Sequence, residues 1–215
     1  VKAVDVAFVN RMLPYCPPTV AAMVELQHYT AMRSGELIQI RPMDIDTSGK
    51  VWIYEPTHHK TRHHGHVRRA HFGPKAQKIL QPFLNRRVDL PCFSPKEAME
   101  QMRQKAEAAR KTPKGQGNTR GSNRKANPKK QPGDAYTTDS YRNAVLAAIE
   151  RANADDKKVQ RFTPHRLRHT AATRIRKEIG LDSARAVLGE RSLGMADEYA
   201  EIDAKLAEKA MAKFG

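Results

Sequence analysis

The spacing of apolar and polar positions predicts a chain built mainly from helices. Apolar residues recur at helical intervals from residue 17 to Arg33, after two prolines that suit a first helical turn. Another helix is expected to begin at Gly73-Pro74, and four more to cover about 137–153, 164–178, 181–189 and 203–213. Gly180 is a plausible stop for the helix over 164–178.

Two short segments have the composition of β-strands. Residues 50–54 and 67–72 are rich in β-branched and aromatic side chains, and the polar stretch between them contains Gly65. This arrangement predicts an antiparallel hairpin. The expected fold class is therefore α+β, mainly α, with a small antiparallel β-sheet packed against helices.

Charge narrows the class of partner. Lysine and arginine number 39 against 23 acidic residues, which leaves a net charge of +16 and favours a polyanion such as DNA. No apolar run is long enough to cross a bilayer, and no signal-peptide pattern opens the chain. Cys16 and Cys92 lack metal-type spacing, so a cytoplasmic, nucleoid-associated location is expected.

One segment is far more basic than the rest. Residues 101–132 hold ten lysines and arginines against the single acid Glu107. Between 111 and 133 no large apolar side chain occurs, so burial cannot offset the entropy of ordering, and a mobile basic insertion is predicted. Two interpretations stay open: a solvated linker, or a segment that follows a nucleic-acid backbone.

The most informative motif lies at residues 162–170. Thr163 can cap a helix that begins at Pro164, which places His165 and Arg168 on one face where both could reach a single phosphate. The buried stripe of that helix is expected to consist of Leu167, Ala171 and Ile175. Taken alone, this spacing is common and favours a basic surface helix with solvated side chains.

The order of several motifs resolves this ambiguity. Residues 31–37, the Lys60-Thr61 pair, residues 165–170, Leu188-Gly189 and Tyr199 follow one another in the order found in tyrosine recombinases. The chain resembles the catalytic domain of this phage integrase family from residue 1 to residue 215. The basic segment 111–133 would be an insertion, and the family's N-terminal core-binding domain is expected to be absent.

The resemblance assigns roles to individual residues. It implies that Arg33, Lys60, His165 and Arg168 are catalytic and that Tyr199 is the nucleophile, and Glu36 and His169 are the supporting residues. Two guanidinium groups can stabilise the negative oxygens of a pentavalent phosphorane. His165 can act as general base for the phenol, and Lys60 can protonate the departing 5′ oxygen.

The expected chemistry needs no metal and no other cofactor. It forms a 3′-phosphotyrosyl link and a free 5′ hydroxyl, which conserves the energy of the phosphodiester. The implied partners are double-stranded DNA and further copies of the chain, assembled as a homo-oligomer on DNA. The C-terminal tail is expected to dock in trans on DNA, and to lie loose or fold back in the monomer.

Two positions depart from the family pattern. Glu190 occupies a slot where the family usually has His or Trp as a donor to the phosphate, and an ionised carboxylate cannot donate. Either Glu190 is protonated, Arg191 takes the donor role, or cleavage is weakened. Ala31 stands where the family commonly has glycine, a change expected to be tolerated.

The hairpin segment raises two further questions. Six of the nine histidines fall between His58 and His71, but no cysteine accompanies them, so phosphate contacts and solvated turns are favoured over zinc. Arg62 and Arg68 lie close to Lys60, and the hairpin register cannot be read from the sequence.

Two alternatives to a recombinase remain. The first is a DNA-binding module of integrase ancestry that no longer cuts, for which Glu190 is the main argument. The second is a type IB topoisomerase, against which the family's C-terminal tail argues.

Overall fold

The computed structural model describes residues 3–58, 67–113, 131–189 and 197–215, with the backbone alone for 197–203. The α-helices are α1 (Val6–Met12), α2 (Pro18–Thr30), α3 (Ser34–Leu37), α4 (Pro74–Leu80), α5 (Pro95–Ala108), α6 (Thr138–Ala154), α7 (Pro164–Glu178), α8 (Leu181–Leu188) and α9 (Asp197–Phe214). Short 3-10 helices span Leu13–Tyr15, Pro42–Asp44 and Gln81–Phe83. The strands are β1 (Ile45–Asp46), β2 (Trp52–Tyr54) and β3 (Ala70–Phe72). The predicted fold class is confirmed.

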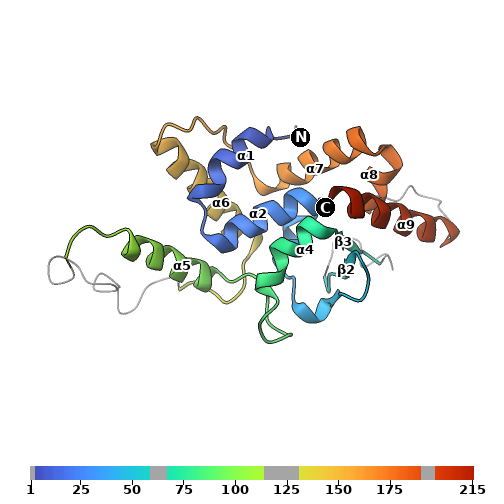
Figure 1. Cartoon of the computed structure of the whole chain (residues 1–215), viewed down its shortest axis with the longest axis horizontal. Coiled ribbons are helices and arrows are strands. Elements are labelled where there is room, and N and C mark those ends of the chain that lie inside the picture. The colour runs from blue at the N-terminus through green and yellow to red at the C-terminus, as the bar shows by residue number, and fades with distance from the viewer. Residues whose placement is uncertain (1–2, 59–66, 114–130, 190–196) are drawn as a thin grey trace.

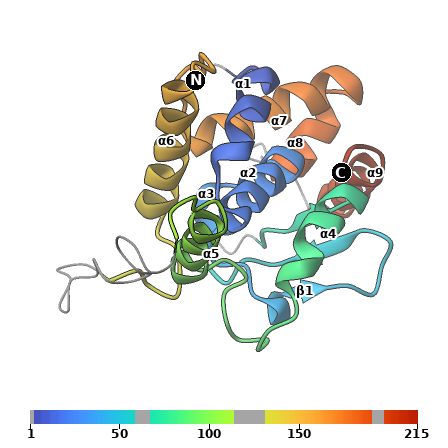
Figure 2. The same ribbon diagram turned by 60° about the vertical axis from the view of Figure 1, so that its left-hand side comes forward.

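Helix α2 is the centre of the molecule and packs against α4, α5, α6 and α7. It occupies the middle of both ribbon views, Figure 1 and Figure 2. Its apolar residues do not form a single stripe, and Val20, Met23, Val24 and Leu26 are all fully buried. A helix that is apolar on all sides is one enclosed by other elements, so α2 forms the scaffold of the core.

The three strands form one antiparallel sheet in the order β1-β2-β3. The predicted hairpin is confirmed, with Ile53 opposite His71 in the β2–β3 pair. Both strands are shorter than expected, and β1 was not predicted because two residues carry no readable alternation. The buried Tyr54 donates its hydroxyl to the carbonyl of Glu36 at 2.9 Å, which joins the sheet to α3.

The C-terminal helix α9 folds back onto its own chain. Met211 and Phe214 are buried in a second apolar cluster with residues of α7 and α8. The carbonyl oxygen of Gly215 accepts hydrogen bonds from the main-chain N–H groups of Lys75 and Ala76, at the start of α4. Of the two expectations for the monomer, loose or folded back, the structure has the second. The helix also begins six residues earlier than the expected 203.

Helix α5 was not predicted. It projects away from the other helices at one side of the molecule (Figure 1), and only Ala98 among its residues is buried. Its tether to α2 is polar, because the Oε1 of Gln101 accepts from the hydroxyl and the N–H of Thr19. Most of its side chains are polar or charged, and Met99 and Met102 are exposed, so no apolar face that a core would bury could be read from the sequence.

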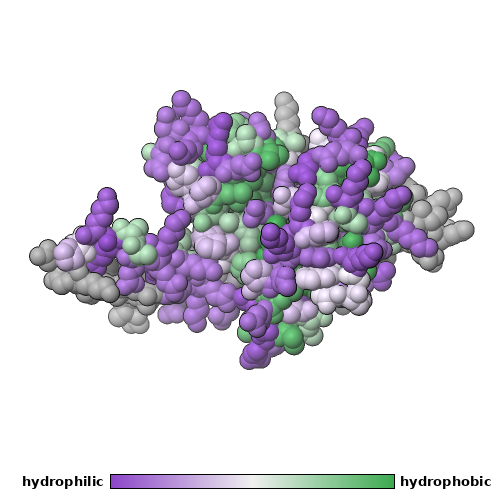
Figure 3. Space-filling view, in the orientation of Figure 1, coloured by the Kyte–Doolittle hydropathy of each residue, from purple (hydrophilic) through white to green (hydrophobic). Residues whose placement is uncertain are grey.

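The surface agrees with the composition. Figure 3 shows a face covered mostly by hydrophilic side chains, with smaller hydrophobic areas between them. Among the described residues, no helix combines the length and the apolar character needed to cross a membrane. The predicted insertion at 111–133 lies largely outside the described residues, so its mobility is not tested.

Candidate active site

Arg33 is the N-cap residue of α3 and not part of α2. Helix α2 ends at Thr30 because Ala31 adopts a left-handed conformation with φ of 55°. The main-chain N–H of Arg33 donates to Oε2 of Glu36 at 3.0 Å, and its Nη1 donates to Oε1 at 2.8 Å. The prediction that one helix runs to Arg33 is therefore wrong, since the left-handed residue ends α2 and redirects the chain.

Glu36 is buried and ionised. Its residue is only 2% exposed. Burial alone would raise its pKa, but the guanidinium group of Arg68 and the hydrogen bonds and charge of Arg33 hold the pKa of this carboxyl below its usual range. Glu36 thus braces the side chain of Arg33, which is the supporting role the resemblance implied.

Helix α7 carries the second pair of candidate residues. His165 lies in its first turn and Arg168 lies three residues later. Leu167, Ala171 and Ile175 are fully buried, so the predicted stripe is confirmed. Thr163 is the N-cap residue, but its hydroxyl makes no capping hydrogen bond within the described part of the chain, contrary to the expectation.

Arg168 is buried and held by two main-chain carbonyls. Its Nη1 donates to the carbonyl of Ala31 at 2.6 Å, and its Nη2 donates to the carbonyl of Leu188 at 3.0 Å. The first bond ties α7 to the turn before Arg33, and the second ties it to the C-terminal end of α8. A guanidinium whose two terminal nitrogens are both held has little freedom to rotate, so its orientation is fixed before an anion binds.

His165 and His169 face each other on successive turns of α7. Their Nε2 atoms are 3.2 Å apart, so one ring donates and the other accepts. Partial burial lowers the pKa of His165, and the positive charges of Arg168 and Arg33 lower it further. The imidazole is therefore neutral at physiological pH, the form a general base requires.

The charges of Arg33 and Arg168 both act on His165. Glu36 is hydrogen-bonded to Arg33 and belongs to the same group of residues. Their elements come from distant parts of the sequence, α3 and α7. The structure does not test the other three assignments. Lys60 and Glu190 lie outside the described residues, and Tyr199 is described only through the backbone of α9.

The sequence suggested Arg68 only as an alternative to Lys60 for the catalytic position in the hairpin. It is 6% exposed, and its Nε and Nη2 lie 3.4 Å from the two carboxyl oxygens of Glu36. The sequence contained a signal for the burial of Arg68. Arg68, Ala70 and Phe72 alternate in the predicted strand, and a period of two places them on one face. Ala70 and Phe72 are buried, and Arg68 is buried with them.

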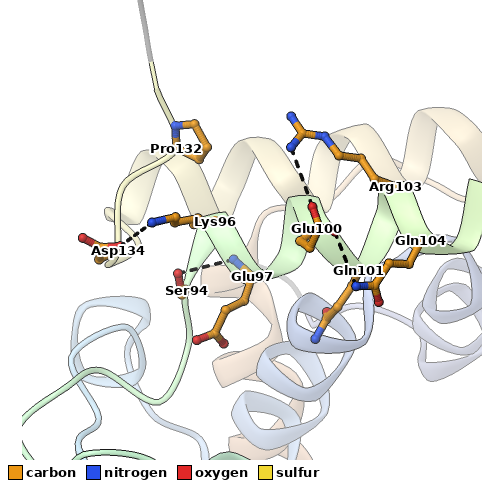
Figure 4. A pocket seen from close by; sticks show the side chains of 9 residues that line it. All are labelled: Ser94, Lys96, Glu97, Glu100, Gln101, Arg103, Gln104, Pro132 and Asp134. Atoms are coloured by element: carbon orange, nitrogen blue, oxygen red, sulfur yellow. Dashed lines mark hydrogen bonds and ion pairs between the residues drawn. The ribbon is translucent and has the colours of Figure 1, made fainter. Parts of the chain in front are cut away.

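Other features of the molecule lie apart from these residues. An open groove of about 740 Å³ runs along α5, where Lys96 approaches Asp134 to 4.0 Å (Figure 4). None of the motif residues lines it. His71 lies in the predicted strand but is buried in β3, so it is neither a solvated residue nor an exposed phosphate contact, and burial lowers its pKa to about 4.

Within the described ranges, neither the cysteines nor a cluster of metal-ligating side chains forms a second catalytic or metal-binding site. Cys16 and Cys92 are buried, and burial raises the pKa of each thiol to about 12, so neither is a ready nucleophile. Across residues 3–58, 67–113, 131–189 and 197–215, no three His, Cys, Asp or Glu side chains gather in a metal-binding arrangement.

The arrangement suits an anion with a phosphate-like shape. The charges of two arginines act on a neutral imidazole, and Glu36 offsets part of the positive charge through its ion pair with Arg33. Such a site can stabilise charge on phosphoryl oxygens and remove a proton from an attacking hydroxyl. These are the two requirements of phosphoryl transfer by a side-chain nucleophile.

Comparison with known proteins agrees with this geometry. The model of the phage integrase family matches residues 6–205, which is most of the chain. No curated protein and no solved structure gives a significant match. The matched span contains Arg33, His165, Arg168 and Tyr199 in the expected order. The chain therefore belongs to the phage integrase family, the tyrosine recombinases, which bind DNA and carry out site-specific recombination through a covalent tyrosine intermediate.

Proposed function

We propose that this recombinase cleaves DNA with Tyr199 as nucleophile and with Arg33 and Arg168 holding the scissile phosphate. The phenolic oxygen of Tyr199 attacks phosphorus, and the bond from phosphorus to the 5′ oxygen breaks. The phenolic proton passes to His165, and Lys60 supplies a proton to the departing 5′ oxygen. The product is a 3′-phosphotyrosyl link beside a free 5′ hydroxyl.

One observation supports this assignment above the others. Arg168, on α7 together with His165, donates to the carbonyl of Ala31, two residues before Arg33, so the segments that carry both arginines and the imidazole are hydrogen-bonded to one another. The lowered pKa of His165 keeps the imidazole unprotonated at neutral pH. Burial of Arg68 against Glu36 also removes one rival of Lys60, because a buried, paired guanidinium is poorly suited to proton donation.

The test is the formation of a covalent adduct. The protein is incubated with a nicked, suicide-type duplex whose site has been selected by binding to this chain, and the products are separated under denaturing conditions. Wild-type protein should form a denaturation-resistant adduct, and Tyr199→Phe should form none. An adduct that survives Tyr199→Phe would rule out this nucleophile.

Glu190 supports a second candidate, a DNA-binding chain with weakened cleavage. A carboxylate near the phosphate repels it and cannot donate a hydrogen bond. Under this alternative the wild-type chain binds the selected site but leaves it uncut. Recovery of the adduct by Glu190→His would then identify Glu190 as the cause.

We further propose that the active form is a homo-oligomer on DNA at the nucleoid, in which the segment after Tyr199 docks on a neighbouring copy. The docking of α9 in cis supports this proposal, because the surface of α4 and α7 that receives Phe214 could accept the same helix from a partner. Light scattering should show monomers without DNA and larger assemblies with it. Constitutive oligomers without DNA would contradict the proposal.

A further inference from the structure

The two proposed catalytic arginines are joined by a closed ring of contacts. Arg33 contacts Glu36, and Glu36 contacts Arg68. Arg68 Nη1 donates to the carbonyl of Val187 at 3.0 Å, and Arg168 Nη2 donates to the adjacent carbonyl of Leu188. The ring closes through Arg168 Nη1 and the carbonyl of Ala31, two residues before Arg33.

Arg68 is the member of the ring that no catalytic motif contains. We propose that Arg68 is a positioning residue for recombination, which orients Arg33 through Glu36 and anchors the end of α8 that leads towards Tyr199. It does not touch the reacting phosphate, because four of its five N–H groups already donate to protein oxygens, those of Glu36, Arg69 and Val187. The proposal rests on the proposed roles of Arg33 and Tyr199.

The geometry of Glu36 explains how Arg68 acts on Arg33. Each carboxyl oxygen of Glu36 has one partner on Arg33 and one on Arg68. The contacts to Arg68 are long, at 3.4 Å, and its charge is the strongest of those that favour the ionised carboxyl. Without Arg68, a carboxylate 2% exposed would keep a single charged partner, and its pKa would rise. A protonated Glu36 would brace Arg33 less well.

The end of α8 is equally dependent on Arg68. Helix C-terminal carbonyls carry partial negative charge, and two guanidinium groups bind them here. The next residue, Gly189, has φ of 64°, and a Cβ at this position would lie 2.9 Å from Nη1 of Arg68. The glycine thus permits both the left-handed turn and the close approach of Arg68.

The adjacent residue supplies a matched control. Arg69 has the same side chain and the next position in the chain, but it points outwards, with its side chain 51% exposed and paired to an exposed Glu55. An exposed ion pair of this kind contributes little to the stability of the protein. Arg69→Gln removes the same charge as Arg68→Gln without touching the ring.

The decisive experiment compares wild type, Arg68→Gln, Arg68→Lys and Arg69→Gln on the selected nicked duplex, under single-turnover conditions with DNA saturating. Arg68→Gln should slow cleavage by roughly 10- to 100-fold, because a small misplacement of a clamp is costly, while DNA affinity changes by less than about threefold. Arg68→Lys keeps the charge and should recover part of the rate. Arg69→Gln should cleave at the wild-type rate.

A second substrate separates positioning from damage to the fold. A methylphosphonate at the scissile position removes the negative charge that Arg33 neutralises, so a defect that acts through Arg33 should shrink on it. Loss of folded protein would reduce the rate equally on both substrates. An Arg68→Gln protein that cleaves at the wild-type rate, or loses the same factor on both substrates, would overturn the proposal.

A third measurement keeps the proposal apart from the proposed function. In the free protein, a carboxyl-carbon titration by nuclear magnetic resonance should show a higher Glu36 pKa in Arg68→Gln than in wild type or Arg69→Gln. If wild type forms no adduct, the catalytic assignment fails and this titration decides the role of Arg68. An unchanged Glu36 pKa would then overturn it.

Discussion

Ala31 joins the two halves of the site through one unusual backbone conformation. Its φ of 55° ends α2, its carbonyl receives Arg168, and the chain then turns to begin α3 at Arg33. The position favours glycine, because a Cβ in the left-handed region costs about 1–2 kcal/mol. This cost is a physical reason for glycine at this position, and the burial of the alanine methyl group offsets part of it.

Replacing Ala31 with glycine should change the free energy of unfolding by less than about 1 kcal/mol, because relief of left-handed strain is offset by the loss of about 0.8 kcal/mol of buried methyl. Urea denaturation followed by circular dichroism measures the change. Ala148→Gly in α6 is the matched control, since Ala148 is also fully buried but within a regular helix. The free energy of unfolding of the control should fall by at least about 1 kcal/mol. An equal fall in Ala31→Gly would contradict the inferred strain at residue 31.

The pH dependence of cleavage should report His165. Its pKa is lowered, so the neutral base is fully present at pH 7 and is lost only as the pH falls through the lowered value. The cleavage rate should therefore decline on the acidic side with a midpoint below about 6.5, the ordinary value for histidine. Single-turnover rates between pH 4.5 and pH 8 measure it. His165→Asn should lack this limb, and a midpoint above the ordinary value would contradict the assignment.

At the scale of single residues, the sequence predicted which side chains form the candidate site better than it predicted their hydrogen-bond partners. Arg33, Glu36, His165 and Arg168 follow from motif order, and the structure brings them together. The carbonyl partners of Arg168 could not be predicted, because they belong to main-chain groups of α8 and of the turn at Ala31. The alternation of Arg68 with Ala70 and Phe72 indicated its burial, but its partner Glu36 lies 32 residues away, and such a distant pairing leaves no local pattern.

The C-terminal helix shows how an element can depend on one close contact. Gly73 precedes α4, and a Cβ added there would lie 1.9 Å from the carbonyl oxygen of Met211 in α9. Arg174 of α7 lies over the ring of Phe214 at 3.9 Å from its centroid. The end of α9 therefore fits between α4 and α7 only if residue 73 has no side chain.

Gly73→Ala should release the end of α9 and leave the core intact, with a stability loss of about 1–3 kcal/mol if the helix is forced to stay docked. Hydrogen exchange should show reduced protection of residues 204–214, and unchanged protection in α2. Gly133→Ala is the control, because its added Cβ would lie 3.5 Å from the nearest atom, an ordinary contact. Full protection of α9 in Gly73→Ala would contradict this account.

The bounds of α6 and α7 were predicted well, whereas α5 and β1 were not predicted. The expected 164–178 matches α7 from Pro164 to Glu178, and 137–153 differs from α6 by one residue at each end. Helix α5 and strand β1 were missed for different reasons. The first buries a single residue, and the second has only two residues. Local start signals for α5 were present, since Ser94 accepts from the N–H of Glu97 and Pro95 is the first helical residue, whereas β1 depends on its pairing with β2.

Across the whole molecule, basic charge extends far beyond the site. The chain carries +16 in total, and residues 101–132 alone hold ten lysines and arginines. Helix α5 starts this stretch and lies on the opposite side of the molecule from α9 in Figure 1. If the segment after α5 follows the DNA backbone, binding spreads over a surface wider than the cleavage site. If it is a solvated linker, its charge adds only long-range attraction.

Exchange of residues 111–133 for a neutral Gly-Ser linker of equal length distinguishes these two interpretations. The segment holds seven lysines and arginines, and each phosphate contact contributes about 0.9 to the slope of log affinity against log salt concentration. Loss of true contacts should make this slope shallower by several units, as measured by fluorescence anisotropy across a salt series. A scrambled 111–133 with the same composition is the control and should keep the wild-type slope, because backbone contacts do not read sequence. An unchanged slope in the Gly-Ser protein would identify the segment as a linker.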